Sequence, residues 1–432
     1  MPKITMIGAG STVFSKEVLG DSIVTPSLAQ SEIALFDIDP VRLEESKAIL
    51  SNINRIHGGK AKISTYTDRE RALAGADFVI NAIQIGGYKP CTVTDFEVPK
   101  KYGLRQTIGD TNGIGGIFRA LRTIPVMLDI AKDMERLCPD AWLLNYTNPM
   151  SMIMGAWFRS TGVKAVGLCH SVQICAEKLL ESLGMEYDKR VQWSIAGVNH
   201  QSWLLEISKD KKDLYPEIRL RAEKQGAPDN DRVRFEVMKR FGYYVTESSE
   251  HCAEYMPYFI KSSYPELIEK FNVPLDEYPR RCIRNIERWA GLKEKLIKES
   301  DTPHKRSHEY ASYIMEAMVT NVPYKLHGNL PNDGLITNLP REACVEVPTL
   351  VDASGINPCY VGDLPPQCAA LNRTMINPQL LTIEAALTLK KEHIYHAALL
   401  DPHLASELPI DQIIALCDDL IAAHEGWLPK YQ

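Results

Sequence analysis

The start of the chain constrains its fold most, because a short apolar strand runs directly into a glycine pair. Residues 3–7 predict a buried strand, and Gly8, Gly10 and Ser11 follow it. Glycines at such a turn let the backbone bend tightly and approach a pyrophosphate, which then lies at the N-terminus of the next helix. The dinucleotide fingerprint is incomplete, since Val13 stands where a third glycine would fall.

The residues that follow complete a dinucleotide-binding pattern. Residues 32–36 predict a second strand, and Asp37 comes directly after it. A carboxylate at this place accepts hydrogen bonds from ribose hydroxyls and repels a 2′-phosphate, so we expect NAD as the cofactor rather than NADP. A further strand is predicted over 78–82, and we expect Asn81 near its end to contact the cofactor.

Strands and helices alternate through the first half of the chain. A helix is predicted over 40–56, and further strands over 142–146 and 165–168. This alternation predicts an α/β protein with a Rossmann-type, doubly wound parallel sheet like that of lactate and malate dehydrogenases. We expect residues 1–200 to form this NAD-binding domain and residues 201–432 to form an α+β domain for substrate binding and oligomerisation.

The second half is richer in helix signals. Long helices are predicted over 276–297, 383–400 and 410–424. Residues 328–334 combine glycine, asparagine, proline and aspartate, which predicts a turn, and the alternation after it predicts a small antiparallel sheet. The predicted helices carry more apolar surface than the core of one domain can bury, so we expect a homodimer or a homotetramer.

Composition excludes several classes of function. The 432 residues carry a net charge of −6 and hold no long basic run, which argues against a nucleic-acid partner. No stretch approaches 18 uninterrupted apolar residues, so we expect no membrane span. The N-terminus lacks the pattern of a signal peptide, and the ten cysteines are scattered, so we expect a cytoplasmic protein with reduced thiols.

Potential metal ligands follow two of the predicted strands. Cys169 and His170 come directly after the strand over 165–168, and His200 follows another strand 30 residues on. Ligands bind at the carboxyl ends of the strands in open α/β sheets. A thiolate and an imidazole at such ends predict a metal site beside the nucleotide site.

Two loops leave alternatives open. Asn148 follows the strand over 142–146, and it either belongs to an ordinary turn or points its amide at the cofactor or a substrate hydroxyl. The segment 106–116 is rich in glycine, and it is either a ligand-binding loop or a mobile surface loop.

Several motifs resemble, in order, those of glycoside hydrolase family 4. They are Gly8–Ser11, Asn145–Pro149, Cys169–Val172, Gly197–His200, Asn338–Pro340 and Val345–Pro348. The resemblance covers essentially the whole chain. Its Cys-His-Ser-Val form is similar to the branch that acts on unphosphorylated α-glycosides, and the overall sequence is most similar to the α-galactosidases of the family.

The resemblance implies an unusual hydrolysis of an α-galactoside such as melibiose. Most glycosidases use two carboxylates, and the NAD-dependent family 4 is an exception. The family oxidises C3 of the sugar with NAD⁺, removes the C2 proton, eliminates the glycosidic oxygen from C1, adds water and returns the hydride. A divalent cation, usually Mn²⁺, binds the C2 and C3 oxygens as a Lewis acid.

The resemblance also implies roles for named residues. Cys169 and His200 match the metal ligands of the family, although Mn²⁺ prefers oxygen ligands to thiolates. His170, next to the thiolate, is expected to protonate the leaving oxygen as general acid. Asn148 is expected to hydrogen-bond the hydroxyls of the sugar and so to turn C3 toward the nicotinamide.

The base that removes the C2 proton is the least determined role. The segment 241–251 holds two tyrosines, two glutamates and a histidine, which is rich for an ordinary helix. Its spacing favours Glu247, with Tyr243 second. A tyrosine base needs its pKa of about 10 lowered by a nearby cation.

Other functions remain open from the sequence alone. An α-glucosidase or an α-galacturonidase of the same family differs from an α-galactosidase in a few hydrogen bonds to the sugar. A lactate- or malate-type dehydrogenase shares the expected fold, but it needs a histidine–aspartate pair, and no aspartate adjoins His200. A non-catalytic nucleotide-binding protein would not need Cys169, His170 and His200 together.

Overall fold

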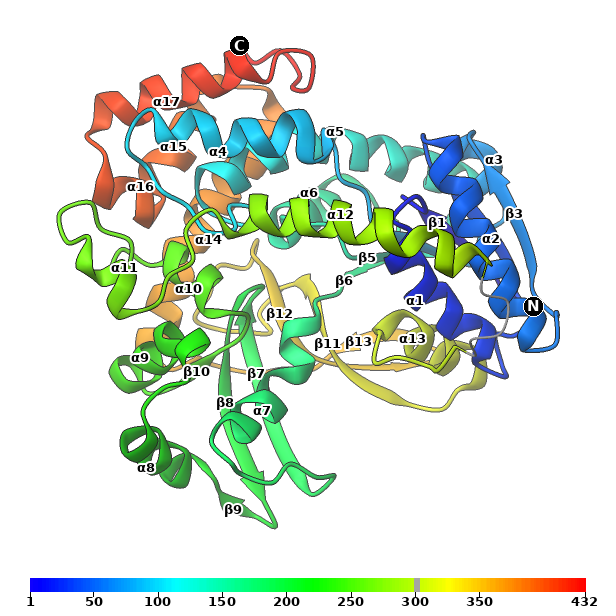
Figure 1. The fold of residues 1–432 in the computed structure, drawn as a ribbon, viewed down its shortest axis with the longest axis horizontal. Helices are drawn as coiled ribbons and strands as arrows, with labels where there is room; N and C mark the ends of the chain where they lie inside the picture. Colours follow the sequence, from blue (N-terminus) through cyan, green and yellow to red (C-terminus); the bar gives the residue numbers. More distant parts are fainter. Residues whose placement is uncertain (299–303) are drawn as a thin grey trace.

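One mixed sheet runs through both halves of the chain (Figure 1). The computed structural model describes residues 1–298 and 304–432, and in these residues thirteen strands belong to that sheet. Its parallel part has the order β3 (Lys62–Tyr66), β2 (Glu32–Phe36), β1 (Lys3–Ile7), β4 (Phe78–Asn81), β5 (Trp142–Asn145) and β6 (Ala165–Gly167). This is the strand order of a Rossmann fold, and the order reverses between β1 and β4. The predicted doubly wound sheet is confirmed.

The second part of the sheet is antiparallel. It consists of β11 (Tyr324–Pro331), β12 (Cys344–Asp352), β7 (Val191–Val198), β8 (Gln201–Lys209) and β10 (Tyr244–Val245), with β13 (Gly355–Pro358) and β9 (Lys212–Asp213) on its sides. Strand β11 joins it to the parallel part where Asn329 pairs with Gly167. The expected small antiparallel sheet is therefore not separate.

The predicted turn over 328–334 is wrong in its first half, because residues 328–331 belong to β11. Gly328 serves close packing there rather than a turn. A Cβ atom at Gly328 would lie 2.8 Å from Cγ2 of Val166, so a larger residue would push β11 away from β6.

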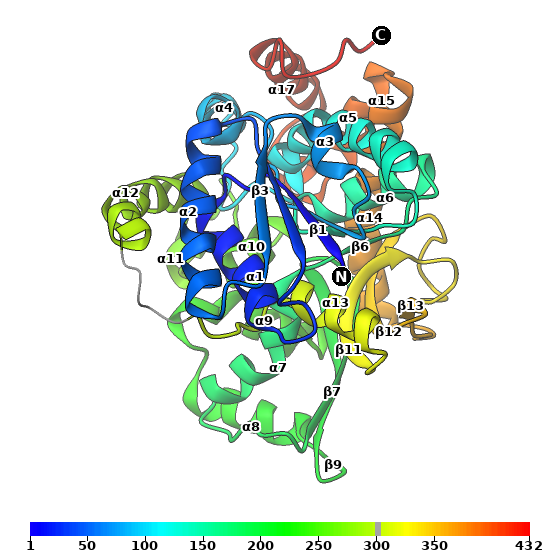
Figure 2. The same ribbon diagram turned by 90° about the vertical axis from the view of Figure 1, so that its right-hand side faces the viewer.

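Helices cover both faces of the parallel strands (Figure 2). The first half contributes α1 (Thr12–Val24), α2 (Pro40–Ile56), α3 (Arg69–Leu73), the π-helix η1 (Gly87–Thr92), α4 (Val93–Lys100), α5 (Gly113–Leu137), α6 (Met150–Ser160) and α7 (His170–Ser182). Helix α2 has the predicted bounds, and Asp39 caps it by accepting hydrogen bonds from the backbone N–H groups of Val41 and Arg42.

The second half adds further helices around the antiparallel strands. They are α8 (Tyr215–Gln225), the 3₁₀ turn η2 (Asp229–Asp231), α9 (Arg232–Phe241), α10 (Ser249–Tyr255), α11 (Glu266–Lys270), α12 (Glu277–Lys298), α13 (Tyr310–Thr320), α14 (Pro366–Thr388), α15 (Lys391–Leu400), α16 (Pro402–Glu407) and α17 (Ile410–Ala423). The long helix predicted over 383–400 is two helices, because Leu389 adopts a left-handed conformation with φ of 58°. No described helix is both long enough and apolar enough to span a bilayer.

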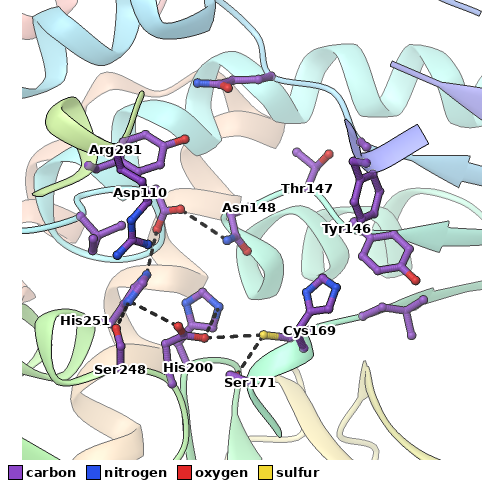
Figure 3. Close-up of a pocket in the computed structure, with 18 of the residues that line it drawn as sticks. Asp110, Tyr146, Thr147, Asn148, Cys169, Ser171, His200, Ser248, His251 and Arg281 are labelled. Carbon is purple, nitrogen blue, oxygen red and sulfur yellow. Dashed lines mark hydrogen bonds and ion pairs between the residues drawn. The ribbon is translucent and has the colours of Figure 1, made fainter. Parts of the chain in front are cut away.

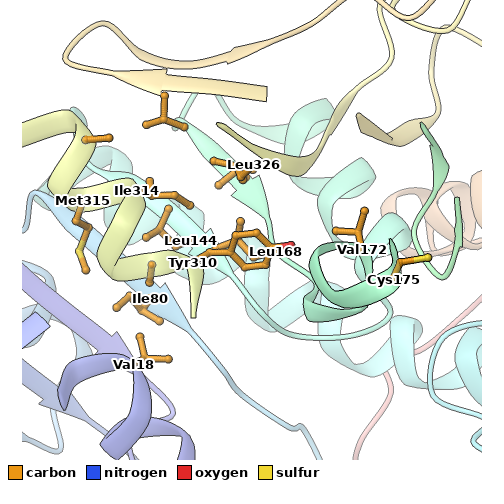
Figure 4. Packing of buried hydrophobic residues seen from close by; sticks show 14 of the residues in the cluster. Val18, Ile80, Leu144, Leu168, Val172, Cys175, Tyr310, Ile314, Met315 and Leu326 are labelled. Atoms are coloured by element: carbon orange, nitrogen blue, oxygen red, sulfur yellow. The ribbon is translucent and has the colours of Figure 1, made fainter. Parts of the chain in front are cut away.

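Two hydrophobic clusters hold the helices to the two faces of the sheet. One cluster joins α1, α2, α7 and α13, and the other joins α5, α6, α14, α15 and α17. In the first cluster, Ile314 of α13 lies near Leu144 of β5, and Ile80 of β4 lies between them and Val18 of α1 (Figure 4). A helix from the second half of the chain thus packs directly on the nucleotide-binding half.

Candidate active site

A cavity of about 610 Å³ opens at the carboxyl ends of β1, β4, β5 and β6. Its residues come from both halves of the chain: Ser11, Phe14, Ala82, Ile83, Gln84, Ile108, Asp110, Arg119, Tyr146, Thr147, Asn148, Leu168, Cys169, His170, Ser171, Ile174, Cys175, Lys178, His200, Arg234, Glu247, Ser248, His251, Tyr278 and Arg281. Most of the sequence-predicted site residues are therefore brought together (Figure 3).

The glycine turn after β1 lies at one end of this cavity. Gly8 has a φ of 87°, and a Cβ atom on it would lie 2.7 Å from the carbonyl oxygen of Ala82. The backbone N–H of Gly10 donates a 2.6 Å hydrogen bond to Oδ2 of Asp37. Ser11 lines the cavity just before α1 begins. The glycines thus let the turn pack closely against Ala82 and Asp37, and of these residues only Ser11 and Ala82 line the cavity.

Asn81 does not line the cavity. Its side chain is fully buried, and its amide N–H groups donate to Oδ1 of Asn145 at 2.8 Å and to Oγ1 of Thr147 at 3.1 Å. The expected cofactor contact is thus replaced by a link between β4, β5 and the turn after β5. Asn81 directly precedes the loop that lines the cavity, and this position in the sequence led to the wrong prediction that it contacts the cofactor.

Three potential metal ligands converge at the other end of the cavity. Sγ of Cys169 lies 3.8 Å from Oε2 of Glu247, and that oxygen lies 3.5 Å from Nε2 of His200. One ligand atom from each of the three residues lies within 4.8 Å of the others. Cys169 precedes α7, His200 lies in the β7–β8 turn, and Glu247 follows β10. Three distant segments thus form one compact S, N and O donor set.

Two of these residues have strained backbones. His200 has a φ of 66° and Glu247 a φ of 68°, in the left-handed region that non-glycine residues rarely adopt. Such strain concentrates at functional sites, where the surrounding structure enforces a useful side-chain position. Here it turns both side chains toward Cys169.

A second acidic residue and a second histidine adjoin the donor set, and sequence reasoning did not single them out. Nε2 of His251 lies 3.7 Å from Oδ1 of Asp110, and its Nδ1 lies 3.5 Å from Oε1 of Glu247. Nδ1 of His200 lies 3.1 Å from Oγ1 of Thr111. The signals in the sequence were the glycine-rich loop that carries Asp110 and the position of His251 four residues after Glu247.

The electrostatics of this end suit a cation. Burial raises the pKa of Cys169 well above its usual range, and the charges of Glu247 and Glu346 raise it further. Burial also acts to raise the pKa of Glu247, but His200 and His251 outweigh it and lower that pKa to about 2. A cation would offset the buried carboxylate charge and displace the proton of the thiol. Oxygen atoms of water and of the sugar hydroxyls would complete the coordination of Mn²⁺ beside Cys169 and His200, so these residues fit such an ion.

His170 and Asn148 also line the cavity. Nε2 of His170 is hydrogen-bonded to Oε1 of Glu309, and the imidazole lies 5.9 Å from the ring of Tyr146. Burial lowers the pKa of His170, but the hydrogen bond and charge of Glu309 outweigh this and raise it. Nδ2 of Asn148 donates to Oδ2 of Asp110 over 3.5 Å. Both side chains line the cavity, as expected from the sequence.

Tyr243 lies outside the cavity. Its ring packs edge-on against Tyr215, with ring centroids 6.0 Å apart, and it contributes to the core beside α8. The short strand β10 separates it from Glu247. The structure therefore leaves Glu247 as the better candidate for the proton acceptor and does not support Tyr243.

Comparison with known proteins identifies the family. The profile described as "Family 4 glycosyl hydrolase" matches residues 3–185, and the one described as "Family 4 glycosyl hydrolase C-terminal domain" matches residues 195–404. An α-galactosidase of Bacillus subtilis is 59% identical over all of both chains. An α-galactosidase of Rhizobium meliloti is 34% identical over 99% of this chain and 89% of that protein.

Solved structures agree with the fold. A putative glucosidase, lplD, of Bacillus subtilis has a TM-score of 0.87 and 26% identity, covering 97% of this chain and 99% of its own. A 6-phospho-β-glucosidase of Thermotoga maritima, with manganese, NAD⁺ and glucose-6-phosphate, has a TM-score of 0.80 and 20% identity over all of both chains. Malate dehydrogenase of Plasmodium falciparum has a TM-score of 0.55 and 13% identity over 90% of this chain and 99% of its own, in line with the expected dehydrogenase-like fold. The profile matches and the full-length identity together place this chain in glycosyl hydrolase family 4.

Proposed function

We propose that this protein hydrolyses α-galactosides, with NAD and a divalent cation such as Mn²⁺ bound in the cavity. The observation that carries the proposal is the convergence of Cys169 and His200, with Glu247 beside them, in a cavity that Ser11 of the turn after β1 also lines. The 59% identity to an α-galactosidase supports the choice of sugar. Melibiose is a substrate of this class.

Gly8, Gly10 and Ser11 would hold the pyrophosphate of NAD, and Asp37 its ribose. Bound NAD supplies a hydride acceptor at C3 of the sugar, and the cation supplies a Lewis acid for the sugar oxygens. Asn148 orients the sugar by hydrogen bonds to its hydroxyls. It lines the same cavity as Ser11 and Cys169.

Two side chains would move protons. Glu247 is ionised and takes the C2 proton, which is acidic once C3 is a ketone, and it gives a proton back to C2 as water adds at C1. His170 gives a proton to the glycosidic oxygen as its bond to C1 breaks, and the water that adds at C1 returns a proton to the imidazole. Neither step needs Tyr243.

The charged groups of the cavity favour a neutral sugar over a galacturonide. Three of its four lysine and arginine side chains are already paired with carboxylates of the protein: Lys178 with Glu181 at 2.8 Å, Arg234 with Asp231 at 2.5 Å and Arg281 with Glu250 at 3.0 Å. The fourth, Arg119, donates a 3.2 Å hydrogen bond to the hydroxyl of Tyr278. A substrate carboxylate would compete with these pairs. An uncharged sugar avoids that competition.

An assay panel tests this proposal. We expect the purified protein, with NAD⁺, Mn²⁺ and a thiol reductant, to release nitrophenol from the aryl α-galactoside faster than from the α-glucoside or the α-galacturonide. A chelator should abolish the release, and added Mn²⁺ should restore it. Steady accumulation of NADH with a hydroxyacid substrate, and no nitrophenol release, would instead indicate a dehydrogenase.

Replacing Gly10 by alanine should weaken NAD binding at least ten-fold. The added Cβ atom would lie 2.7 Å from Oδ2 of Asp37, so the turn or the carboxylate must move away from the cofactor. Fluorescence titration with NADH measures this directly. Gly162→Ala is a matched control, since a Cβ atom there meets no atom within 4 Å and the backbone needs no left-handed conformation. Unchanged NADH affinity in Gly10→Ala would contradict the placement of the pyrophosphate.

We also propose that the protein is a cytoplasmic homodimer or homotetramer that binds no nucleic acid. Exposed apolar side chains on α12, Ile283 and Ile286, support self-association. Light scattering coupled to gel filtration measures the subunit number, and a monomer at micromolar concentration would contradict it.

A further inference from the structure

Three consecutive residues at the start of α13 contact the wall of the active-site cavity. Glu309 is hydrogen-bonded to Nε2 of His170, and the hydroxyl of Tyr310 donates a 2.6 Å bond to the backbone oxygen of Cys169. The backbone N–H of Ala311 donates to the hydroxyl of Tyr146 at 3.1 Å. The start of this helix thus contacts the expected general acid, one metal ligand and a neighbouring wall residue.

The carboxylate of Glu309 has His170 as its hydrogen-bond partner. The Glu309 side chain is only 15% exposed. Its second oxygen, Oε2, is buried and has no hydrogen-bond partner among residues 1–298 and 304–432. The His170 side chain is 52% exposed, so the carboxylate side of this pair is shielded from water while the imidazole faces the open part of the cavity wall.

The segment before α13 is fastened to the nucleotide-binding half by Asp21 of α1. Oδ1 of this buried carboxylate lies 2.7 Å from Nε2 of His304 and accepts a 2.8 Å bond from the backbone N–H of Ser307. The hydroxyl of Ser307 donates to Oδ2 of Asp21 at 2.5 Å and accepts a 3.1 Å bond from the N–H of Glu309. A Cβ atom on Gly20 would lie 2.9 Å from the ring of His304, so the glycine makes room for this contact.

We propose that Glu309 is a positioning residue for proton donation by His170, an inference that rests on the proposed function. The hydrogen bond at Nε2 holds the imidazole against the cavity wall and leaves Nδ1 to face the glycosidic oxygen. The Nδ1 proton passes to that oxygen as the C1–O bond breaks and the electron pair leaves with it. The path from Asp21 through Ser307 to Glu309 keeps this arrangement fixed.

A leaving-group comparison tests the proposal. Melibiose releases a sugar alkoxide that needs a proton, whereas a dinitrophenyl α-galactoside releases a stable phenolate that does not. We expect Glu309→Ala to lower kcat on melibiose by about 100-fold, the scale of general acid catalysis, and on the dinitrophenyl substrate by less than about three-fold. Glu309→Gln, which keeps the shape and a hydrogen-bond acceptor, should lose less on melibiose than the alanine variant.

Glu316→Ala is the control, because Glu316 lies on the same helix and pairs with Arg306 at 2.6 Å, away from the cavity. It should change kcat on both substrates by less than two-fold. Equal losses on both substrates in Glu309→Ala and Glu309→Gln, or no loss on melibiose in either, would overturn the positioning role. A wild-type protein that cleaves neither galactoside would overturn the proposed function itself, and this inference with it.

Discussion

Replacing Cys169 by serine should lower kcat for α-galactoside hydrolysis by at least about 1,000-fold, the effect of losing several kcal/mol of Lewis-acid stabilisation. Sγ of Cys169 is the sulfur donor of the three-residue set with His200 and Glu247. A serine hydroxyl has nearly the same shape but does not ionise near neutral pH, so the set loses one anionic ligand. The measurement is the rate of nitrophenol release at saturating Mn²⁺ and NAD⁺.

Cys138→Ser is the matched control for this substitution. Cys138 is as buried as Cys169, with exposed fractions of 5% and 8%, but it ends α5 and does not line the cavity. It should change kcat by less than about two-fold if the fold is kept. Retained activity in Cys169→Ser, with Mn²⁺ affinity unchanged, would show that the thiol is not a ligand.

Replacing Glu247 by glutamine should lower kcat by about 100- to 10,000-fold, the range for loss of a general base. The amide keeps the volume of the side chain but cannot accept the C2 proton. The direct measurement is exchange of the C2 hydrogen of the sugar into deuterated water, followed by NMR. We expect exchange to disappear in this variant and to persist in Glu250→Gln, whose carboxylate pairs with Arg281 instead.

The same variant separates two roles for Glu247. Its oxygen lies 3.5 Å from Nε2 of His200 and 3.8 Å from Sγ of Cys169, so it adjoins both proposed ligands. A proton acceptor predicts lost exchange with Mn²⁺ affinity changed by less than about three-fold. A drop in Mn²⁺ affinity of ten-fold or more would make Glu247 chiefly a ligand, and full exchange in the variant would refute the base.

The nucleotide-binding half was predictable because its signals are local. Strands β1 and β2 and helix α2 have their predicted bounds, since each is an apolar strand or a capped amphipathic helix. Strand β3 (Lys62–Tyr66) was missed because it is an edge strand with no apolar run and only one residue, Ile63, of high apolar character. The sequence also did not indicate that the parallel and antiparallel strands form one sheet, because the two parts are joined by one bridge between β11 and β6.

Site residues could be predicted from the sequence only where they directly follow a predicted strand. Cys169 and His200 each follow a strand, and the structure brings them together as expected. The contact between His170 and Glu309 spans 139 residues of chain, and nothing near Glu309 in the sequence indicates it. Asn81 was misplaced because the next residue, Ala82, lines the cavity while the side chain of Asn81 is buried. Tyr243 was misplaced because its side chain packs, partly buried, against the core.

Cobalt substitution tests the central claim, that a thiolate and an imidazole from separate loops hold one cation in this cavity. Thiolate-bound Co²⁺ gives an intense charge-transfer absorption in the near ultraviolet that oxygen and nitrogen ligands do not produce. We predict this band on adding Co²⁺ to the wild-type protein, its loss in Cys169→Ser and its retention in Cys138→Ser. Co²⁺ binding without the band, or a band that survives in Cys169→Ser, would contradict the account.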